Sequence, residues 1–600
     1  MATSRRTDRR TRTSRPRLPA AQVGTPAVRH RLVLSMIMVA VLALSGRLLW
    51  VQGLDASARA QEAIDARTTT RTIPALRGDI TDRDGTVLAS SVERFDLWVN
   101  QRQVSTYQKD DKKAVAAGDT GVKAAAADLA PVLGWTVEDT EKALTGDKGF
   151  KYLQKNVEPA VRNAVIALKI PGLGADRVAD RLYPAGSVGG NVLGFVGADG
   201  APLAGAELSY DDLLAGTNGK TTYERGAGGQ IIPTATQSTT AAVDGSDLVL
   251  TLDRDLQWKA QEIIASAVDK WGATAGSIVI LDAHTGEVLT LAEAPTYDPN
   301  SPEADSYLGN RTVSDVYEPG STGKLFTLAA ALEEGTVDMD SQYTVPYTMS
   351  FNGERIKDSH SHPTQKLTLA GVLKNSSNVG TVQISETLSD QTRYDYLKAF
   401  GLGEATGVGL PGESKGIVHD PSKWTGRTKY TTAFGQGYAV TALQMVSAIS
   451  TFANDGVRVQ PQIVKGVKEE DGSVRSLGEP TQTRVVSSET SQKILELMDN
   501  NVVDDGKTNG DVPGYAVAAK SGTAQVPGED GGITYTASFI GTAPADDPDI
   551  VIGVTLFGLN SFISGTTAAA PAFSEIMAYT LQNQGIAPTG KPGRELENEW

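Results

Sequence analysis

The sequence predicts an α+β protein with a single N-terminal transmembrane helix, a mixed domain after it, and a larger domain in which helices flank a central antiparallel sheet. Three observations lead to this prediction. A long apolar run lies close to the N-terminus. Glycine-rich turns and mixed patterns follow it up to about residue 245. Beyond that point, strand patterns stand at both ends of the remaining chain and helical patterns lie between them, as expected when helices cover one sheet.

Composition sets the first limits on function. The 600 residues include no cysteine, which excludes disulfides, thiolate catalysis and cysteine-containing zinc sites. The formal net charge is −15, but the first 31 residues carry nine arginines and one aspartate, a local charge of +8. The rest of the chain therefore carries −23. Such a basic tail either binds nucleic acid or marks the cytoplasmic side of a membrane segment.

The apolar run favours the membrane over nucleic acid. Residues 32–46 carry no charge, and after Arg47 the run continues to Leu54, enough for a helix of about 20 residues across the hydrocarbon core. Arg47 and Trp50 lie near its far end, where such side chains reach the interface. The alternative is a cleaved signal peptide, but the hydrophobic stretch is long for one.

We therefore expect a retained single-pass anchor in the plasma membrane. The preceding arginines place the N-terminus in the cytoplasm and everything after the anchor outside. The predicted regions are a cytoplasmic basic tail, the anchor, a mixed domain here called the pedestal, a larger domain and a polar C-terminal tail, at residues 1–31, 32–54, 55–245, 246–584 and 585–600. In the pedestal, an alanine-rich stretch over residues 113–133 favours a helix.

The larger domain opens with a strand, a helix and a hairpin. The run "GSDLVLTLD" (245–253) predicts a strand. Residues 254–271 have helical spacing, with five apolar positions on one face, at Leu256, Ala260, Ile263, Ile264 and Ala267. Residues 276–292 contain two short β runs joined by a glycine-containing turn, which predicts a hairpin.

The end of the larger domain repeats the strand pattern. Three strand candidates at hairpin spacing are followed by one helix candidate, at residues 515–526, 536–545, 549–558 and 568–584. Strands first and last with helices between them indicate one central sheet.

The stretch "EPGSTGKL" (318–325) has two possible interpretations. A phosphate-binding loop requires G-x-x-x-x-G-K-[ST], but Glu318 stands at the first glycine position and Leu325 at the hydroxyl position. A glutamate beside a phosphate would also repel it, so the nucleotide-binding interpretation fails. The second interpretation is S-x-x-K, with Ser321 at the start of a predicted helix over 322–335 and Lys324 one turn along.

S-x-x-K has a chemical use at this position. A serine hydroxyl becomes a good nucleophile only when a base takes its proton. A lysine amine can do so if burial or a nearby cation keeps it neutral. A helix N-terminus also directs backbone N–H groups at a developing oxyanion. The motif alone is weak, because it occurs by chance in a chain of this length.

Two further motifs follow in the order that strengthens the prediction. Ser376-Ser377-Asn378 lies at the end of a helical stretch, and Lys520-Ser521-Gly522-Thr523 lies inside a strand-like run. S-x-x-K with S-D-N and K-T-G is the signature of penicillin-binding proteins and class A β-lactamases. On these motifs the chain resembles the class B penicillin-binding proteins, which are monofunctional peptidoglycan D,D-transpeptidases.

The resemblance extends beyond the three motifs. "RGDITDRDGTVLA" (77–89), "RLYPAGSVGGNVLGFVG" (181–197), "LPGESKG" (410–416) and "ASFIGTAPAD" (537–546) are similar to stretches of that family. Serine at 521, where threonine is commoner, keeps the hydroxyl. The resemblance implies a penicillin-binding/β-lactamase-like serine acyl-transferase fold for residues 246–584.

The resemblance also implies roles for individual residues. Ser321 would be the nucleophile and Lys324 its base. Ser376 would relay a proton to the leaving amine, while Asn378 would bind the substrate backbone and hold Lys324. Lys520 would keep Lys324 neutral and attract the substrate carboxylate, which the hydroxyls at 521 and 523 would bind beside Gly522. The backbone N–H groups of residues 321 and 523 would form the oxyanion hole.

The implied partners are peptidoglycan stem peptides on lipid-linked or nascent glycan, β-lactam antibiotics, the membrane, a polytopic glycan polymerase and other division proteins. No cofactor, metal or nucleic acid is expected, since His360 and His362 in "DSHSHP" have no evident third ligand. The Arg-rich tail and residues 434–456 are most like the septal cell-division type. The alternatives are an elongation-type transpeptidase, a membrane-anchored β-lactam sensor or β-lactamase, and an inactive scaffold.

Overall fold

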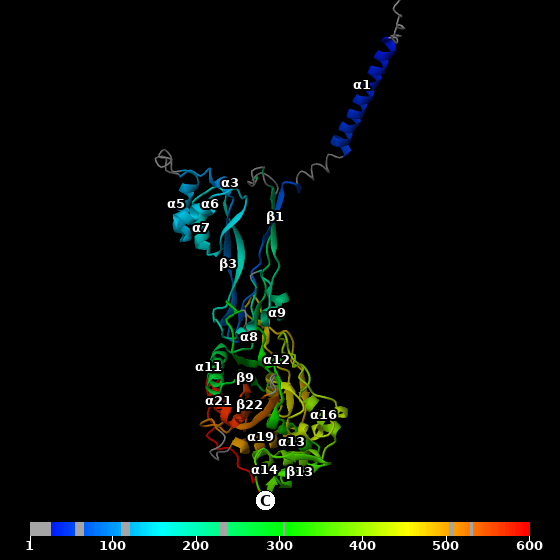
Figure 1. Cartoon of the computed structure of the whole chain (residues 1–600), viewed down its shortest axis with the longest axis vertical. Coiled ribbons are helices and arrows are strands. Elements are labelled where there is room, and N and C mark those ends of the chain that lie inside the picture. Colours follow the sequence, from blue (N-terminus) through cyan, green and yellow to red (C-terminus); the bar gives the residue numbers. More distant parts are fainter. Residues whose placement is uncertain are drawn as a thin grey trace, which may run out of the picture. The chain divides into compact units, whose positions relative to one another are not determined.

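The computed structural model describes residues 26–54, 65–109, 120–197, 199–224, 226, 232, 237–303, 307–502, 509–527 and 532–600. The chain forms two compact units, which are described separately. The first contains residues up to 72 together with residues 220–240. The second contains residues 73–219 and 241–600. Figure 1 shows the elements of both.

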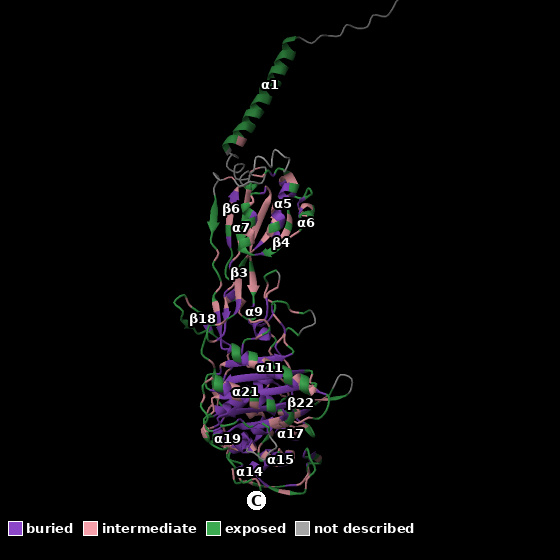
Figure 2. Cartoon of the chain, turned by 90° about the vertical axis from the view of Figure 1, so that its left-hand side faces the viewer, coloured by how far each residue is buried: buried purple, intermediate pink, exposed green. Residues whose placement is uncertain are grey.

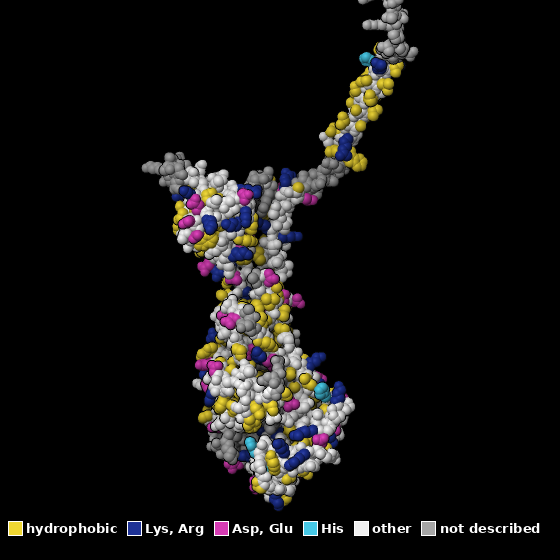
Figure 3. All heavy atoms as spheres, in the orientation of Figure 1, with side chains coloured by type: hydrophobic (Ala, Val, Ile, Leu, Met, Phe, Trp, Pro, Cys, Tyr) yellow, Lys and Arg dark blue, Asp and Glu magenta, His cyan; other side chains and the backbone are white. Residues whose placement is uncertain are grey.

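The first unit contains the predicted anchor. Helix α1 (Pro26–Leu49) continues as a π-helical turn at Trp50–Leu54 and buries none of its residues. Over residues 26–53 it is the one helix in the described part of the chain that is long and apolar enough to span a membrane. Hydrophobic side chains cover it in Figure 3. The anchor predicted at 32–54 coincides with this helix, while residues 1–25 of the predicted basic tail lie outside the described residues.

The rest of the first unit is a small sheet. Its strands are β1 (Thr68–Ile73), β6 (Gly219–Glu224) and β7 (Ser238–Thr240), in the order β1-β6-β7. Strands β6 and β7 are antiparallel, with Lys220 opposite Thr240.

The second unit begins with a sheet that crosses the predicted boundary at residue 245. Strands β2 (Ile80–Thr81), β3 (Val87–Val99), β4 (Lys151–Val157) and β5 (Leu173–Leu182) come from the pedestal region. Three later strands extend the sheet on the other side of β2, in the order β19-β18-β8-β2-β3-β4, namely β8 (Asp247–Leu250), β18 (Val464–Lys468) and β19 (Val474–Arg475). Strand β8 pairs with β2 in parallel, so residues on both sides of position 245 share one sheet.

Three helices pack beside strands β3 and β5. They are α5 (Gly121–Leu133), α6 (Val137–Leu144) and α7 (Pro159–Ala167). A hydrophobic core links them to the strands through Leu97, Leu129 and Leu144, all with 0% exposure. The helix predicted over 113–133 is therefore present as α5, while residues 113–119 lie outside the described residues.

The central sheet of the larger domain has five antiparallel strands in the order β10-β9-β23-β22-β21. They are β9 (Ala275–Asp282), β10 (Val288–Ala294), β21 (Ala518–Pro527), β22 (Ile533–Ala543) and β23 (Ile550–Leu559). The predicted hairpin and the three predicted late strands are all present. The predicted antiparallel sheet flanked by helices is confirmed.

Helices cover both faces of this sheet. Ile278 and Ile280 of β9 belong to a core with α11 (Arg254–Trp271) and α21 (Ala570–Asn583). Val279 and Leu281, which point the opposite way, belong to a second core with α18 (Ala442–Ala453). A strand that packs against helices on both faces carries apolar side chains on both, which explains why residues 278–281 lack alternation. The buried strands lie between helices in Figure 2.

The face predicted for α11 is the buried one. Leu256, Ala260, Ile263, Ile264 and Ala267 are all buried, together with Gln257. The helix begins after Asp253, whose side chain accepts hydrogen bonds from two backbone N–H groups, and ends at a left-handed glycine with φ of 63°.

The rest of the larger domain is a layer of helices and two-stranded sheets. Its helices are α12 (Arg311–Ser314), α13 (Lys324–Glu333), α14 (Leu369–Lys374), α15 (Asn378–Ser385), α16 (Asp390–Ala399), α17 (Thr428–Thr431), α19 (Ser488–Val502) and α20 (Gly565–Ala568). Its short strands pair as β11 (Val316–Tyr317) with β16 (Val440–Thr441), β12 (Gln342–Val345) with β15 (Gln365–Thr368), and β13 (Thr348–Phe351) with β14 (Glu354–Lys357).

The polar C-terminal segment is attached to this layer. The carbonyl of Asn598 accepts a hydrogen bond from Thr368 N at 3.2 Å, at the start of α14. The side chain of Asn500, on α19 and with 0% exposure, accepts from Leu596 N at 3.0 Å and donates to Asn598 Oδ1 at 2.9 Å. The segment therefore ties α14 to α19.

Removing residues 596–600 should destabilise the larger domain by about 2 kcal/mol, because it leaves the buried amide of Asn500 without partners. Thermal unfolding monitored by circular dichroism should show a midpoint lowered by several degrees. The exposed Glu595 provides the control, since Glu595→Ala should leave the midpoint unchanged. An unchanged midpoint in the truncated protein would contradict the structural role of this segment.

Candidate active site

Ser321 lies in a tight turn that leads into α13. Residues Gly320–Gly323 form a 3-10 helix, and α13 follows directly at Lys324. Gly320 has a φ of +57°, which a side chain would strain. A Cβ at Gly320 would lie 2.7 Å from the carbonyl oxygen of Thr523, and one at Gly435 would lie 1.9 Å from the carbonyl oxygen of Gly320. These glycines allow the turn to pack between β21 and the segment around residue 435.

Lys324 is completely buried and contacts both predicted serines. Its Nζ lies 3.0 Å from Ser321 Oγ and 3.1 Å from Ser376 Oγ. The Ser376 carbonyl accepts a third hydrogen bond from it at 2.5 Å. The side chain is 0% exposed, so these three oxygens replace water around the amine. The first two predicted motifs thus meet at a single nitrogen.

The electrostatic surroundings of Lys324 favour a neutral amine. Burial lowers its pKa far below the ordinary value, and the positive charge of Lys520 lowers it further. The carboxylate of Asp358 acts in the opposite direction. Burial also lowers the pKa of Lys520, to about 8. A neutral amine 3.0 Å from a serine hydroxyl is placed to take the hydroxyl proton.

The second motif lies between two helices. Ser376 connects α14 to α15 with a φ of +52°, an uncommon conformation for a residue with a side chain. Ser377 caps α15 by accepting a hydrogen bond from Gly380 N at 2.9 Å. The side-chain amide of Asn378 donates to the carbonyl of Lys357 at 3.1 Å. Asn378 therefore contacts the β13–β14 hairpin, and its predicted bond to Lys324 is not among the interactions of the described residues.

The third motif lies on β21, the edge strand of the central sheet. Lys520 Nζ lies 3.2 Å from the carbonyl of Ser521, and Thr523 Oγ1 accepts from Gly565 N at 3.2 Å. Gly522 faces the serine turn, where a Cβ would lie 2.6 Å from the carbonyl oxygen of Pro319. A Cβ placed at Gly320 would lie 3.2 Å from the backbone nitrogen of Thr523. Strand and turn are therefore in direct backbone contact beside Ser321.

Sequence reasoning missed several residues that hold these parts in place. Glu318, noted only because it spoils a phosphate loop, accepts a hydrogen bond from Gly437 N at 2.7 Å. Burial raises the pKa of Glu318. The side chain of Asp358 is buried, with 6% exposure, and it accepts hydrogen bonds from Ser377 of the second motif and from the backbone of Val379. His362, which the sequence analysis considered only as a metal ligand, lies with its Nε2 3.0 Å from Asp358 Oδ2. No short motif marks these residues, because Glu318 binds a backbone N–H group 119 positions later and Asp358 binds groups 19 and 21 positions later in the chain.

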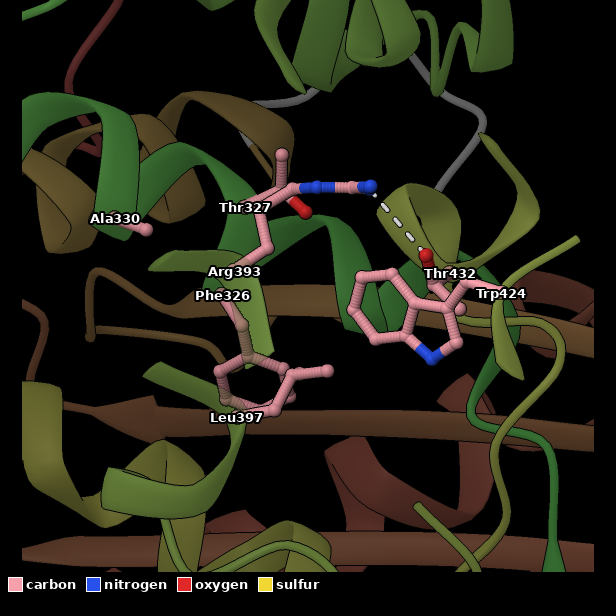
Figure 4. A pocket seen from close by; sticks show the side chains of 7 residues that line it. All are labelled: Phe326, Thr327, Ala330, Arg393, Leu397, Trp424 and Thr432. Atoms are coloured by element: carbon pink, nitrogen blue, oxygen red, sulfur yellow. Dashed lines mark hydrogen bonds between the residues drawn. The ribbon is translucent and has the colours of Figure 1, made fainter. Parts of the chain in front are cut away.

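A small internal cavity behind α13 is another feature that the sequence does not indicate (Figure 4). Arg393 extends into it and donates to Thr432 Oγ1 at 3.3 Å and to the Lys429 carbonyl at 2.9 Å. Its guanidinium lies 5.0 Å from the ring centre of Trp424. From α13, Thr327 donates to the Ala433 carbonyl at 2.8 Å. These contacts fix the chain segment that leads to Gly435 and the serine turn.

Comparisons with known proteins agree with this site. A family model described as the penicillin binding protein transpeptidase domain matches residues 276–578, and one described as the penicillin-binding protein dimerisation domain matches residues 72–202. Penicillin-binding protein PbpB of Mycolicibacterium smegmatis is 36% identical over 98% of this chain and 96% of the relative. The chain belongs to the class B penicillin-binding proteins. The resemblance drawn from the motifs is therefore confirmed.

Two further proteins are similar to this chain over most of its length. Peptidoglycan D,D-transpeptidase FtsI of Escherichia coli is 31% identical over 96% of this chain and 95% of the relative. The crystal structure of penicillin-binding protein 3 from Mycobacterium tuberculosis, complexed with aztreonam, is 31% identical with a TM-score of 0.67. It covers 88% of this chain and 100% of its own. The roles of the individual site residues remain predictions.

Replacing Lys520 should change the pH at which the serine becomes reactive. The Lys520 charge lowers the pKa of Lys324, so Lys520→Met should raise that pKa and move the rising limb of the acylation profile to higher pH. Lys520→Arg keeps the charge and should leave the limb close to its original position. The measurement is the second-order rate of acylation by a fluorescent penicillin as a function of pH. Identical profiles for the Met and Arg variants would show that the Lys520 charge does not act on the base.

Proposed function

We propose that the protein is a peptidoglycan D,D-transpeptidase that cross-links stem peptides through a serine acyl-enzyme. The observation that carries the proposal is the contact of the buried Lys324 amine with both Ser321 and Ser376, at 3.0 and 3.1 Å. This arrangement supplies a nucleophile, a base and a second hydroxyl within one hydrogen-bonded group, as acyl transfer requires. The likeness to FtsI, named a peptidoglycan D,D-transpeptidase, extends over 96% of the chain.

In the first half-reaction, Ser321 Oγ attacks the carbonyl carbon of the penultimate D-Ala while Lys324 takes the hydroxyl proton. The backbone N–H groups of Ser321 and Thr523 stabilise the negative oxygen of the tetrahedral intermediate. The proton taken by Lys324 passes through Ser376 to the leaving nitrogen, the C–N bond breaks, and the terminal D-Ala departs as a free amino acid. Lys520 and the hydroxyls of Ser521 and Thr523 bind its carboxylate before it leaves.

In the second half-reaction, an amine of a neighbouring stem peptide attacks the acyl-enzyme. A new peptide bond forms, the ester bond to Ser321 breaks, and the amine proton returns to the serine oxygen through Lys324. Asn378 holds the substrate backbone. A β-lactam mimics the acyl donor and acylates Ser321 in the same way, which agrees with the aztreonam complex of the related protein.

We also propose a cellular setting for the protein. Residues 1–31 lie in the cytoplasm, residues 32–54 cross the plasma membrane once, and the catalytic domain at 246–584 acts outside on nascent glycan. Residues 55–245 form a pedestal that contacts a polytopic glycan polymerase and other division proteins, and residues 585–600 end the chain. We place the protein in septal wall synthesis, because the relatives PbpB and FtsI match it over nearly its whole length.

Incubation with penicillin should give a covalent adduct on Ser321, located by mass spectrometry after proteolysis. Ser321→Ala should abolish the adduct, whereas Ser301→Ala at an exposed serine should leave it unchanged. The adduct should persist for many minutes. Label on another residue would overturn the mechanism, and release within seconds would favour the β-lactamase alternative.

Depleting the protein from its host should produce filamentous cells, since septal synthesis fails while elongation continues. The unsubstituted gene should restore division and Ser321→Ala should not. Rounded cells would assign the protein to elongation instead, and restoration by Ser321→Ala would indicate a scaffold.

A further inference from the structure

Asp358 is a buried carboxylate that the proposed reaction does not use. It follows β14 directly and is 6% exposed. Its Oδ2 accepts a hydrogen bond from Ser377 Oγ at 2.7 Å, and its Oδ1 accepts one from Val379 N at 2.8 Å. His362 Nε2 lies 3.0 Å from Oδ2. Three groups from two different segments therefore share this one carboxylate.

The contacts of Asp358 hold the residues next to Ser376, which binds the Lys324 amine. Ser377 and Val379 follow Ser376 closely in the chain, and both are held by Asp358. Ser376 itself has a φ of +52°, a conformation that persists only where surrounding contacts impose it. Its carbonyl and hydroxyl both contact Lys324 Nζ. Asp358 thus fixes the loop whose geometry places two of the three oxygens around Lys324.

Asp358 also acts on Lys324 through its charge. Its carboxylate favours the protonated amine and so opposes Lys520, which favours the neutral one. A charged amine cannot accept the serine proton. The opposing effects of Asp358 and Lys520 therefore decide how often Lys324 is able to act as the base. Any group that weakens the field of Asp358 therefore makes Lys324 more often neutral.

His362 is such a group. Its Nδ1 lies 2.7 Å from the Pro363 carbonyl, and its Nε2 faces the carboxylate, so both ring nitrogens point at oxygen acceptors. A neutral imidazole can donate to only one of them, whereas the doubly protonated ring satisfies both. A positive ring would partly neutralise Asp358 at a separation of 3.0 Å.

The surroundings of the pair contain few other charges. Tyr347, before β13, makes a T-shaped contact with the His362 ring at 5.9 Å between ring centres, and the Tyr347 carbonyl accepts a hydrogen bond from Asp358 N at 3.0 Å. From α13, Lys324 interacts electrostatically with Asp358, and from β21 the charge of Lys520 also acts on Lys324. His360 lies in the same loop but is exposed.

We propose that Asp358 and His362 are positioning residues that hold the Ser376 loop and together set the electrostatic field at Lys324. This inference rests on the proposed function and deepens it. Asp358 supplies the negative charge and the two hydrogen bonds that fix the loop, and His362 moderates that charge. The net negative charge of the pair favours the protonated form of Lys324, whereas the charge of Lys520 favours the neutral form.

Two variants with opposite expected effects test the proposal. Asp358→Asn removes the negative charge, so the rising limb of the acylation profile with fluorescent penicillin should move to lower pH by about half a unit or more. The maximal rate should fall about tenfold, because the loop loses its anchor. His362→Ala leaves the carboxylate less compensated, so the limb should move to higher pH. His360→Ala, in the same loop, should leave the profile unchanged.

A second readout follows the Lys324 amine without catalysis. Competitive labelling with acetic anhydride, with Lys324 located by mass spectrometry, should show the same two shifts in its titration. Reduced rates with unshifted titration in both variants, or shifts in the same direction, would overturn the proposal. If penicillin never acylates the unsubstituted protein, the proposed function fails, while the labelling titration still decides the role of Asp358 and His362.

Discussion

The arrangement of the site depends on one buried amine. A charged lysine taken out of water costs several kcal/mol unless it is neutralised or fully paired. Lys324 has 0% exposure and is surrounded by two hydroxyls and a carbonyl, with a second buried lysine nearby. Burial and the nearby charge of Lys520 both lower the pKa of this amine and so favour its neutral form, which is also the form that can take a proton. Burial and catalysis therefore require the same environment.

That environment depends on three chain segments that meet around the Lys324 amine. The edge strand β21 brings Lys520, the turn before α13 brings Ser321, and the connection between α14 and α15 brings Ser376. Strand and turn approach so closely that side chains at Gly320 or Gly522 would collide with backbone oxygens. Helix α19 contacts β21, α13 and α14, and the C-terminal segment connects α19 to α14. The sheet thus provides the edge strand against which the serine turn packs.

Local patterns in the sequence predicted the elements that depend on neighbouring residues. The buried face of α11, the β9–β10 hairpin and the late antiparallel strands follow from apolar spacing and turn residues. The three motifs predicted which residues meet. The sequence did not predict Asp358, Arg393 or the role of Glu318, because each acts through contacts with backbone groups or distant side chains. Nor did it predict that β8 and β18 join the pedestal sheet, since strand pairing between residues 168 or more positions apart leaves no local signal.

The stretch at 318–325 shows why a glycine-rich pattern needs its surroundings before it has a meaning. In a phosphate loop, glycines free backbone N–H groups for an anion and a lysine neutralises it. Here Gly320 allows backbone contact with Thr523, and Lys324 points at Ser321 and Ser376. Glu318, which would repel a phosphate, binds the N–H of Gly437 and so fixes the far side of the turn. The residue that excludes one function is thus a structural requirement of the other, because it holds the segment against which the serine turn packs.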